Sequence, residues 1–349
     1  MHSASRPSVC LVVLVSLVAV VSFAREARAQ GDDTIGVRAQ GMGGAFTAVA
    51  DDATATWWNP AGMAGGAYFN ALIEGGSHRV PSSERTAAGD LQSAWRAETR
   101  SISVAFPALG LSYYRLQVSE IQPQTSTGTA SPVRQDGGAT EVRLRSLTLS
   151  QFGATVGQSL GSHFVIGSTF KLVTAGDAFL VQASGTASLD TATGIVVPSE
   201  THGGLDVGAM AVFGPARIAV MVRNVTETEF GNGSDVFTLS RHARAGAAFS
   251  TGTRGVIGTA TIAVDADLTT TTTVLGDERR VAVGGEVWTG QRTIGVRGGI
   301  GTNTIGSRRT SFSGGASAAL KKGLYVDGEI TGGTDEGRHG WGAGLRVTF

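Results

Sequence analysis

A few residues have types and spacings that could carry chemistry, and a serine motif is the most specific of them. Gly157-Gln158-Ser159-Leu160-Gly161 matches the nucleophile-elbow pattern of serine hydrolases. That motif needs a strand, a sharp turn and a helix, whereas a second alternating, strand-like segment follows here at once. We therefore interpret it as a tight turn between two strands and expect no enzyme. A membrane-barrel hydrolase that uses a loop serine and a histidine is the enzymatic alternative.

The remaining motifs that could bind an ion or a cofactor also lack the necessary spacing. The cluster of Gly41, Gly43 and Gly44 has no third spaced glycine and no preceding strand, so it does not predict a dinucleotide loop. Asp51 and Asp52 have no further oxygen ligands at calcium-loop spacing. The histidines after residue 30 are scattered without the paired spacing of a metal site: His78, His163, His202, His242 and His339. We expect no cofactor and no metal.

The start of the chain predicts export. Arg6 precedes an apolar run over residues 11–24, which is short for a membrane span and suited to a signal-peptide core. Ala27 and Ala29 are small residues at the two positions that a signal peptidase reads, so we expect cleavage before Gln30. A single transmembrane anchor is the less favoured alternative.

Cysteine and charge limit what the mature chain can do. Cys10 is the only cysteine and lies in the predicted signal peptide, so we expect no disulfide and no thiolate site. Removal of Arg6, Arg25, Arg28 and Glu26 leaves 25 basic and 27 acidic residues. A net charge near −2 gives no reason to expect nucleic acid as a partner.

Hydrophobic residues alternate along most of the remaining chain, as in strands with one apolar face. Near the end, Trp341 and Leu345 fall on one face, whereas Gly342 and Arg346 fall on the other. The chain is also rich in glycine, with 51 of 349 residues, and no later apolar run is long enough for a transmembrane helix. Strands can cross lipid only in a closed sheet, so the pattern favours a membrane barrel over a soluble one.

The alternation predicts an all-β fold, a transmembrane antiparallel β-barrel of about fourteen strands with a small N-terminal helical plug. The predicted strand cores are 67–79, 99–107, 110–119, 143–160, 162–174, 203–213, 215–225, 240–251, 258–268, 279–288, 292–301, 311–320, 323–333 and 338–349. Long connections, around Asp90, Thr129, Thr191, Gly231, Thr272 and Gly306, alternate with short ones. In outer-membrane barrels the short turns face the periplasm.

Two details refine this prediction. The alternation changes phase between Arg143 and Leu160, and a β-bulge would reconcile the two halves of that strand. Trp288 and Trp341 lie near strand ends and are candidates for an aromatic belt at the membrane surface. The final residue, Phe349, ends an amphipathic strand, as in barrels that the outer-membrane assembly machinery recognises.

The segment 36–63 differs from the strands, because it is rich in alanine and does not alternate. It predicts two short helices, the second ending at Asn59-Pro60. Its run from Arg38-Ala-Gln-Gly-Met-Gly-Gly-Ala-Phe-Thr-Ala-Val-Ala-Asp-Asp52 to Trp58-Asn-Pro-Ala-Gly62 closely resembles the start of FadL-like outer-membrane proteins, the long-chain fatty-acid transporter superfamily. The resemblance is nearest to the PorV/PorQ-like branch and covers about thirty residues.

This resemblance implies a fourteen-stranded barrel whose N-terminal segment folds into the lumen as a plug, with Asn59, Pro60 and Ala61 in the place of the family's Asn-Pro-Ala motif. The division of the chain that follows is 1–29 signal peptide, 30–66 plug and 67–349 barrel. Gly41, Gly43 and Gly44 would allow the plug to pack closely on strand backbones. Gating and a purely structural role in closing the barrel remain alternatives of similar weight.

If the apolar faces meet lipid, the opposite faces line the lumen with charges of both signs. These residues are Lys171, Asp206, Arg217, Arg223, Arg244, Asp265, Asp267, Glu286, Arg297, Asp327, Glu329 and Arg346. We favour internal salt bridges that stiffen the wall and hold the plug; a polar permeation path is the alternative. A wholly apolar fatty-acid tunnel is not evident, which departs from the substrate that the resemblance implies.

Two functions fit these patterns. The first is passive transport of small hydrophobic or amphipathic molecules across the outer membrane. The second is a non-transporting outer-membrane partner of a protein secretion or surface-attachment system, as the resemblance to PorV-like proteins implies. The expected partners are outer-membrane lipid, the barrel-assembly machinery and either a hydrophobic small molecule or secretion proteins.

Overall fold

The computed structural model describes residues 34–80, 94–123, 141–183, 186–231, 236–252, 257–273, 276–334 and 338–349. The predicted signal peptide and the predicted connections around Asp90 and Thr129 lie outside the described residues. Among the described residues, no helix has the length and apolar character to span a membrane.

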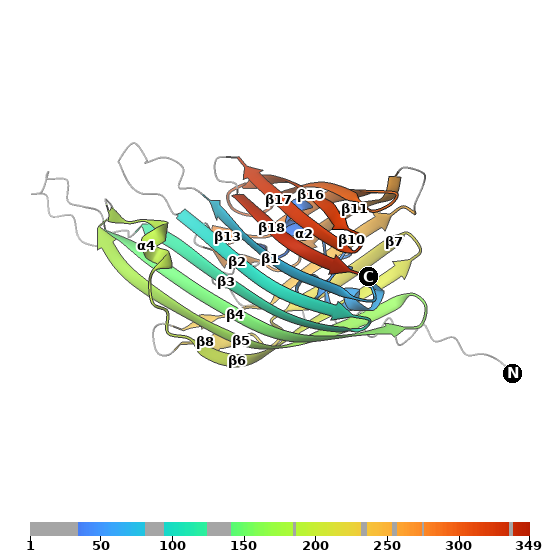
Figure 1. Ribbon diagram of the computed structural model, residues 1–349. Helices are drawn as coiled ribbons and strands as arrows, with labels where there is room; N and C mark the ends of the chain where they lie inside the picture. The colour runs from blue at the N-terminus through green and yellow to red at the C-terminus, as the bar shows by residue number, and fades with distance from the viewer. Residues whose placement is uncertain are drawn as a thin grey trace, which may run out of the picture.

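Fourteen antiparallel strands form a closed barrel, which confirms the predicted fold class (Figure 1). Each strand pairs with its neighbours in the barrel, and β18 pairs with β1 to close it. The strands are β1 (Asn70–Val80), β2 (Ala94–Phe106), β3 (Leu109–Pro123), β4 (Glu141–Leu160), β5 (Phe164–Ala183), β6 (Glu200–Phe213), β7 (Ala216–Arg223), β10 (His242–Ser250), β11 (Ile257–Asp267), β14 (Arg280–Thr289), β15 (Ile294–Asn303), β16 (Thr310–Lys321), β17 (Leu324–Gly333) and β18 (His339–Thr348).

Closure of the barrel continues past the last ladder pair. The backbone amide of Phe349 donates to the carbonyl of Phe69 at 2.9 Å, and the amide of Phe69 donates to the carbonyl of Phe349 at 3.2 Å. The two rings stack with centroids 6.2 Å apart. The C-terminus thus lies at the end of the barrel that carries the short turns (Figure 1).

The two faces of the wall differ as the alternation predicts. Apolar side chains of every second residue point outward and are exposed, as a lipid-facing surface requires. Examples are Ile73, Ile102, Phe152, Phe170, Ile218, Phe249, Ile262, Val264, Val296, Phe312, Ile330 and Leu345. Trp341 also lies on this face. Trp288 does not: it points inward, is 2% exposed and packs edge-on against Tyr325, so its assignment to an aromatic belt is wrong.

The bulge predicted in the strand from Arg143 to Leu160 is absent. β4 pairs with β3 and with β5 in unbroken register over its whole length. Leu147 and Leu149 are buried on the inner face, whereas Phe152 and Val156 are exposed on the outer face. The phase of the alternation changes because the inner wall becomes apolar along this strand, so a regular strand explains the pattern.

Structure also fills connections that were predicted only as long loops. Thr191 lies in helix α4 (Leu189–Thr193), and the side chain of Ser188 caps this helix by accepting from the Thr191 amide at 3.0 Å. α4 packs against the outer face of β2, β3 and β4 at their long-connection ends (Figure 1). Two small sheets occupy other connections, β8 (Glu229–Phe230) with β9 (Phe237–Thr238) and β12 (Thr271–Thr273) with β13 (Gly276–Glu278).

The N-terminal segment lies inside the barrel. It forms α2 (Val37–Gly41), α3 (Ala55–Trp58) and the 3-10 helix η2 (Pro60–Gly65). α2 contacts β15 to β18 and β1, whereas η2 contacts β3 to β6 across the lumen. Nearly every residue of 34–63 is buried. α3 ends at Trp58 and Asn59 caps η2, so the predicted stop of the second helix at Asn59-Pro60 is confirmed.

Candidate functional site

The Asn-Pro-Ala motif contacts the wall where the wall has no side chain. A Cβ at Gly208 of β6 would lie 2.0 Å from the Oδ1 of Asn59, and one at Gly167 of β5 would lie 2.3 Å from the carbonyl carbon of Pro60. Asn59 donates from Nδ2 to the carbonyl of Thr47 at 3.0 Å and accepts from the Ala61 amide at 3.0 Å. The motif therefore joins two turns of the segment and places them against backbone of the wall.

The glycine cluster contacts the opposite side of the barrel in the same way. Gly43 has φ +69°, and a Cβ there would lie 2.8 Å from the backbone nitrogen of Ile300. A Cβ at Gly299 would in turn lie 2.2 Å from the carbonyl carbon of Met42. Gly44 also has a positive φ, +86°, whereas Gly41 leaves room for the Arg297 side chain. Glycine is needed on both surfaces because backbone packs on backbone.

Arg38 of α2 is the ionic link between the segment and the wall. Its Nε and Nη2 donate to the two carboxylate oxygens of Glu286 on β14 at 2.8 and 2.7 Å, a bidentate pair. Its Nη1 contacts Asp51 and lies 3.1 Å from Asp52. An ion pair between the segment and the wall was expected. The cation comes from the segment, since Arg38 is buried among the two aspartates of the segment and the wall carboxylate.

The predicted lumen charges all lie on the inner side of the wall, and four of them form one network: Glu286, Arg297, Asp327 and Arg346. Arg297 lies 3.5 Å from Glu286 and 3.4 Å from Asp327, and Arg346 lies 3.0 Å from the same Asp327. Glu329 pairs with His78 at 3.0 Å. These side chains are buried, so each charge depends on its partners rather than on water.

The other predicted charges form separate pairs. Lys171 contacts Asp206 at 2.6 Å, and Arg244 contacts Asp267 at 2.6 Å. His242 lies 3.1 Å from Asp267 and 3.0 Å from an Nη of Arg223. Arg223 and Arg244 also lie over the rings of Trp57 and Trp58, at 4.6 and 5.3 Å from the centroids. Arg217 donates to the carbonyl of Val49 at 3.2 Å.

The side chain of Asp265 binds the backbone of the N-terminal segment. Its Oδ2 accepts from the amides of Phe46 and Thr47 at 2.9 and 2.8 Å. Gly246 on the neighbouring strand leaves the space, since a Cβ there would lie 2.2 Å from the Oδ1 of Asp265. A carboxylate that accepts two amides fixes the position of this turn.

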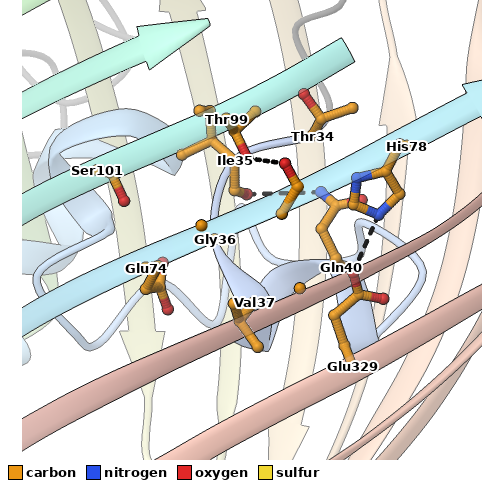
Figure 2. A pocket seen from close by; sticks show the side chains of 13 residues that line it. Thr34, Ile35, Gly36, Val37, Gln40, Glu74, His78, Thr99, Ser101 and Glu329 are labelled. Atoms are coloured by element: carbon orange, nitrogen blue, oxygen red, sulfur yellow. Dashed lines mark hydrogen bonds and ion pairs between the residues drawn. The ribbon is translucent and has the colours of Figure 1, made fainter. Parts of the chain in front are cut away.

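A small polar cavity lies between α2 and the wall of β1, β2, β17 and β18 (Figure 2). It has room for about one water molecule, with a volume near 10 Å³. Gln40, Glu74, His78 and Glu329 line it. Figure 2 shows the contact of His78 with Glu329. It draws no contact between Glu74 and another side chain, and Glu74 is only 6% exposed. Glu74 is a buried acid that sequence reasoning missed.

Part of the inner wall of β1 to β5 has a different character, and we call this part the apolar wall. Toward the long-connection end it carries Val80, Trp95, Ala97, Leu116, Val118, Leu147, Leu149, Val173 and Ala175, joined by Phe230, Phe237 and Leu239 from the connection after β7. The next inward-facing residue of β3 after Leu116, toward the short-turn end, is Tyr114. Its ring packs edge-on against Trp57, with the ring centroids 5.1 Å apart. The apolar wall thus ends one inward position before the side chain that contacts the segment.

Sequence reasoning missed this surface, although a signal was available. The phase change in β4 marks Leu147 and Leu149 as inward residues once the strand is regular. The same phase places Arg145 inward, where it contacts Glu120 at 3.2 Å and Asp177 at 2.7 Å. This ion group lies at the rim of the apolar wall.

The motifs with catalytic resemblance have no catalytic surroundings. Ser159 is exposed near the end of β4 and pairs with Val165 of the next strand, not with a helix. Within the described part of the chain, no three histidine, cysteine or acidic residues gather as a metal site. His78 and His242 each contact a carboxylate of the wall, Glu329 and Asp267 respectively.

Comparison with known proteins supports the fold. No family model and no curated protein matches the sequence. Among solved structures, the CymD monoaromatic hydrocarbon channel superposes with a TM-score of 0.57 at 13% identity, covering 92% of this chain and 99% of that one. A mutant of the TodX monoaromatic hydrocarbon channel gives 0.58 at 11% identity, with 90% and 99% covered.

A FadL homologue from Pseudomonas aeruginosa gives a TM-score of 0.54 at 10% identity, covering 89% of this chain and 97% of that one. At these identities the likeness concerns the fold alone. The chain therefore has the FadL-like fold, a fourteen-stranded barrel that its N-terminal segment enters.

Proposed function

We propose that the protein is an outer-membrane channel that passes small hydrophobic or amphipathic molecules without an energy source, and that the segment 34–65 is its plug. The observation that carries this proposal is the apolar wall. It lies at the long-connection end of the lumen, and one inward position further along β3 Tyr114 packs on Trp57 of the segment. Apolar solutes partition onto such a surface, whereas a salt-bridged wall offers them nothing.

The location rests on two supports. Exposed apolar side chains predominate on the outward face of the barrel, which lipid satisfies and water does not. The solved structures with this fold include two named as monoaromatic hydrocarbon channels, which favours small apolar solutes for this chain too. We further propose export through the predicted signal peptide and insertion by the barrel-assembly machinery through β18.

Transport is tested by uptake of a labelled monoaromatic solute into proteoliposomes, with glucose as a solute that the channel should pass poorly. Leu149→Gln places an amide on the apolar wall and should slow aromatic uptake several-fold. Leu172→Gln makes the same change on the outer face of β5 and should not. Uptake that is equal for both variants and the native protein would remove the apolar wall from the transport path.

The plug role is tested separately by deleting residues 36–56. The folded barrel should then show raised conductance in planar bilayers, because fourteen strands enclose more space than their own side chains fill. A deletion that inserts but conducts no better would show that the segment is not the gate. A deletion that never folds would favour the structural alternative.

A second function keeps one specific observation in its favour. The buried ion pair of Arg38 with Glu286 fixes the segment to the wall, and Arg297 contacts the same Glu286. A rigid lumen suits a protein that works by binding partners. We propose this alternative in the PorV/PorQ-like sense, as a partner of a secretion or surface-attachment system. It predicts no solute uptake above that of empty liposomes and a stable complex with other envelope proteins after cross-linking in cells.

A further inference from the structure

Two arginines stand directly opposite each other on the outer face of the barrel. Arg100 of β2 and Arg115 of β3 are paired in register, and both are exposed. Neither has an ion pair or hydrogen bond among the described residues, whereas the nearby Arg96 contacts Asp190 of α4 at 2.8 Å and Glu98 at 3.6 Å. Like charges directly across a ladder repel, and an anion between the two guanidinium groups would offset that repulsion.

The pair lies at the edge of the apolar outer surface. In the next row toward the short turns, Ile102 of β2 pairs with Tyr113 of β3, and Tyr113 pairs with Phe152 of β4. All three side chains are exposed. The row of the arginines continues as Ser150 on β4. One row further out, Gln117 donates to the carbonyl of Thr193 at 2.9 Å, beneath α4. A change from apolar to polar residues of this kind is expected at the level of the lipid headgroups.

An apolar groove begins at the same place. It has a volume near 660 Å³ on the outer face of β17, β18, β1 and β2, and Arg100 lies on its rim. Ile73, Ile102, Val326 and Leu345 line it, with Gly75 among its backbone residues. An acyl chain fits such a groove by burying its methylene groups, while the arginines take a phosphate in bidentate hydrogen bonds.

We propose that this surface is a binding site for a phosphorylated lipid of the leaflet on the long-connection side. Arg100 and Arg115 bind its headgroup phosphate, and one acyl chain lies in the groove. The proposal rests on the proposed membrane location and is independent of transport. A fixed lipid here would hold β1 to β3 against the bilayer beside the apolar wall.

Native mass spectrometry of the full barrel in detergent tests the site, with lipid A and dephosphorylated lipid A as probes. The native protein should retain lipid A about tenfold better than the phosphate-free form, because charge-assisted hydrogen bonds are lost with the phosphate. Arg100→Gln with Arg115→Gln should remove that difference. Arg308→Gln with Lys322→Gln removes the same charge elsewhere and should preserve it. Equal retention by both double variants would overturn the proposal.

A second pair of variants tests the groove. Ala343→Phe fills it and should weaken binding of both lipids, whereas Ala318→Phe, outward on β16, should not. If Ala343→Phe has no effect and inorganic phosphate displaces the lipid fully, the arginines bind free phosphate and the lipid site is wrong. If the double glutamine variant fails to fold, Arg100→Lys with Arg115→Lys keeps the charge and loses the guanidinium fork. Unchanged retention in it also overturns the proposal.

A separate experiment tests the proposed membrane location. Fractionation of cells should recover the native protein with membranes, with gel mobility that changes on heating. Soluble protein released by osmotic shock would contradict the location, whatever the lipid variants show.

Discussion

The two sides of the lumen use opposite solutions to the same problem, which is how to fill a wide barrel. The wall of β10 to β18, together with Arg38, fills it with buried ion pairs such as Arg346 with Asp327. The apolar wall of β1 to β5 fills it with leucine, valine and aromatic side chains. Ion pairs are directional and fix one arrangement, whereas apolar contacts tolerate small shifts. From this difference we expect the N-terminal segment to be fixed more rigidly on the charged side than on the apolar side.

The largest expected effect comes from breaking the charged side. Arg38→Met leaves Asp51, Asp52 and Glu286 without their shared cation and should lower the free energy of unfolding by about 3–5 kcal/mol. Glu286→Gln keeps Arg38 with both aspartates and should cost about 1–3 kcal/mol. Urea unfolding of the barrel in detergent micelles measures both. Equal losses in the two variants would mean that Arg38 acts through Glu286 alone.

On the outer face, a new charge should cost the same free energy of unfolding on the charged side of the barrel and on the apolar side. Val264→Arg on β11 and Phe152→Arg on β4 both put a charge into the lipid-facing surface and should each cost about 2–4 kcal/mol in bilayer-based unfolding. Thr261 points inward on β11, close to Ser250, so Thr261→Arg should lower the free energy of unfolding by less. A penalty for Phe152→Arg as small as that for Thr261→Arg would place the membrane elsewhere on β4.

A smaller effect is expected on the apolar wall. Leu116→Ala removes a side chain that is 2% exposed and should lower the free energy of unfolding by about 2 kcal/mol, the low end for a buried leucine, because neighbouring apolar groups can relax into the space. The same urea titration reports it. A loss as large as that of Arg38→Met would show that this side is as rigid as the charged side.

The sequence predicted the strands well and the lumen only in part. Period-two alternation found all fourteen strands and many of the inward charges, although it missed Glu74 and Arg145, because lipid and lumen demand opposite residue types. It could not assign partners: Arg38 lies 248 residues from Glu286, and no local pattern joins them. It also misread β4 and Trp288, because an apolar inner wall and an outer belt look alike from one strand. The resemblance in 36–63 predicted a lumen segment, but not that Asp51 and Asp52 would be held by Arg38.

The most direct test of the account locks the yielding side. A Cβ at Gly110 of β3 would lie 2.8 Å from the Cγ2 of Thr56 in α3, so Thr56→Cys with Gly110→Cys should form a disulfide in a mature chain without other cysteines. Uptake of a labelled monoaromatic solute into proteoliposomes is then compared before and after reduction of that disulfide, with bond formation checked by thiol labelling. The account predicts little uptake in the oxidised protein and recovery on reduction. Equal uptake in the two states would contradict passage between the segment and the apolar wall.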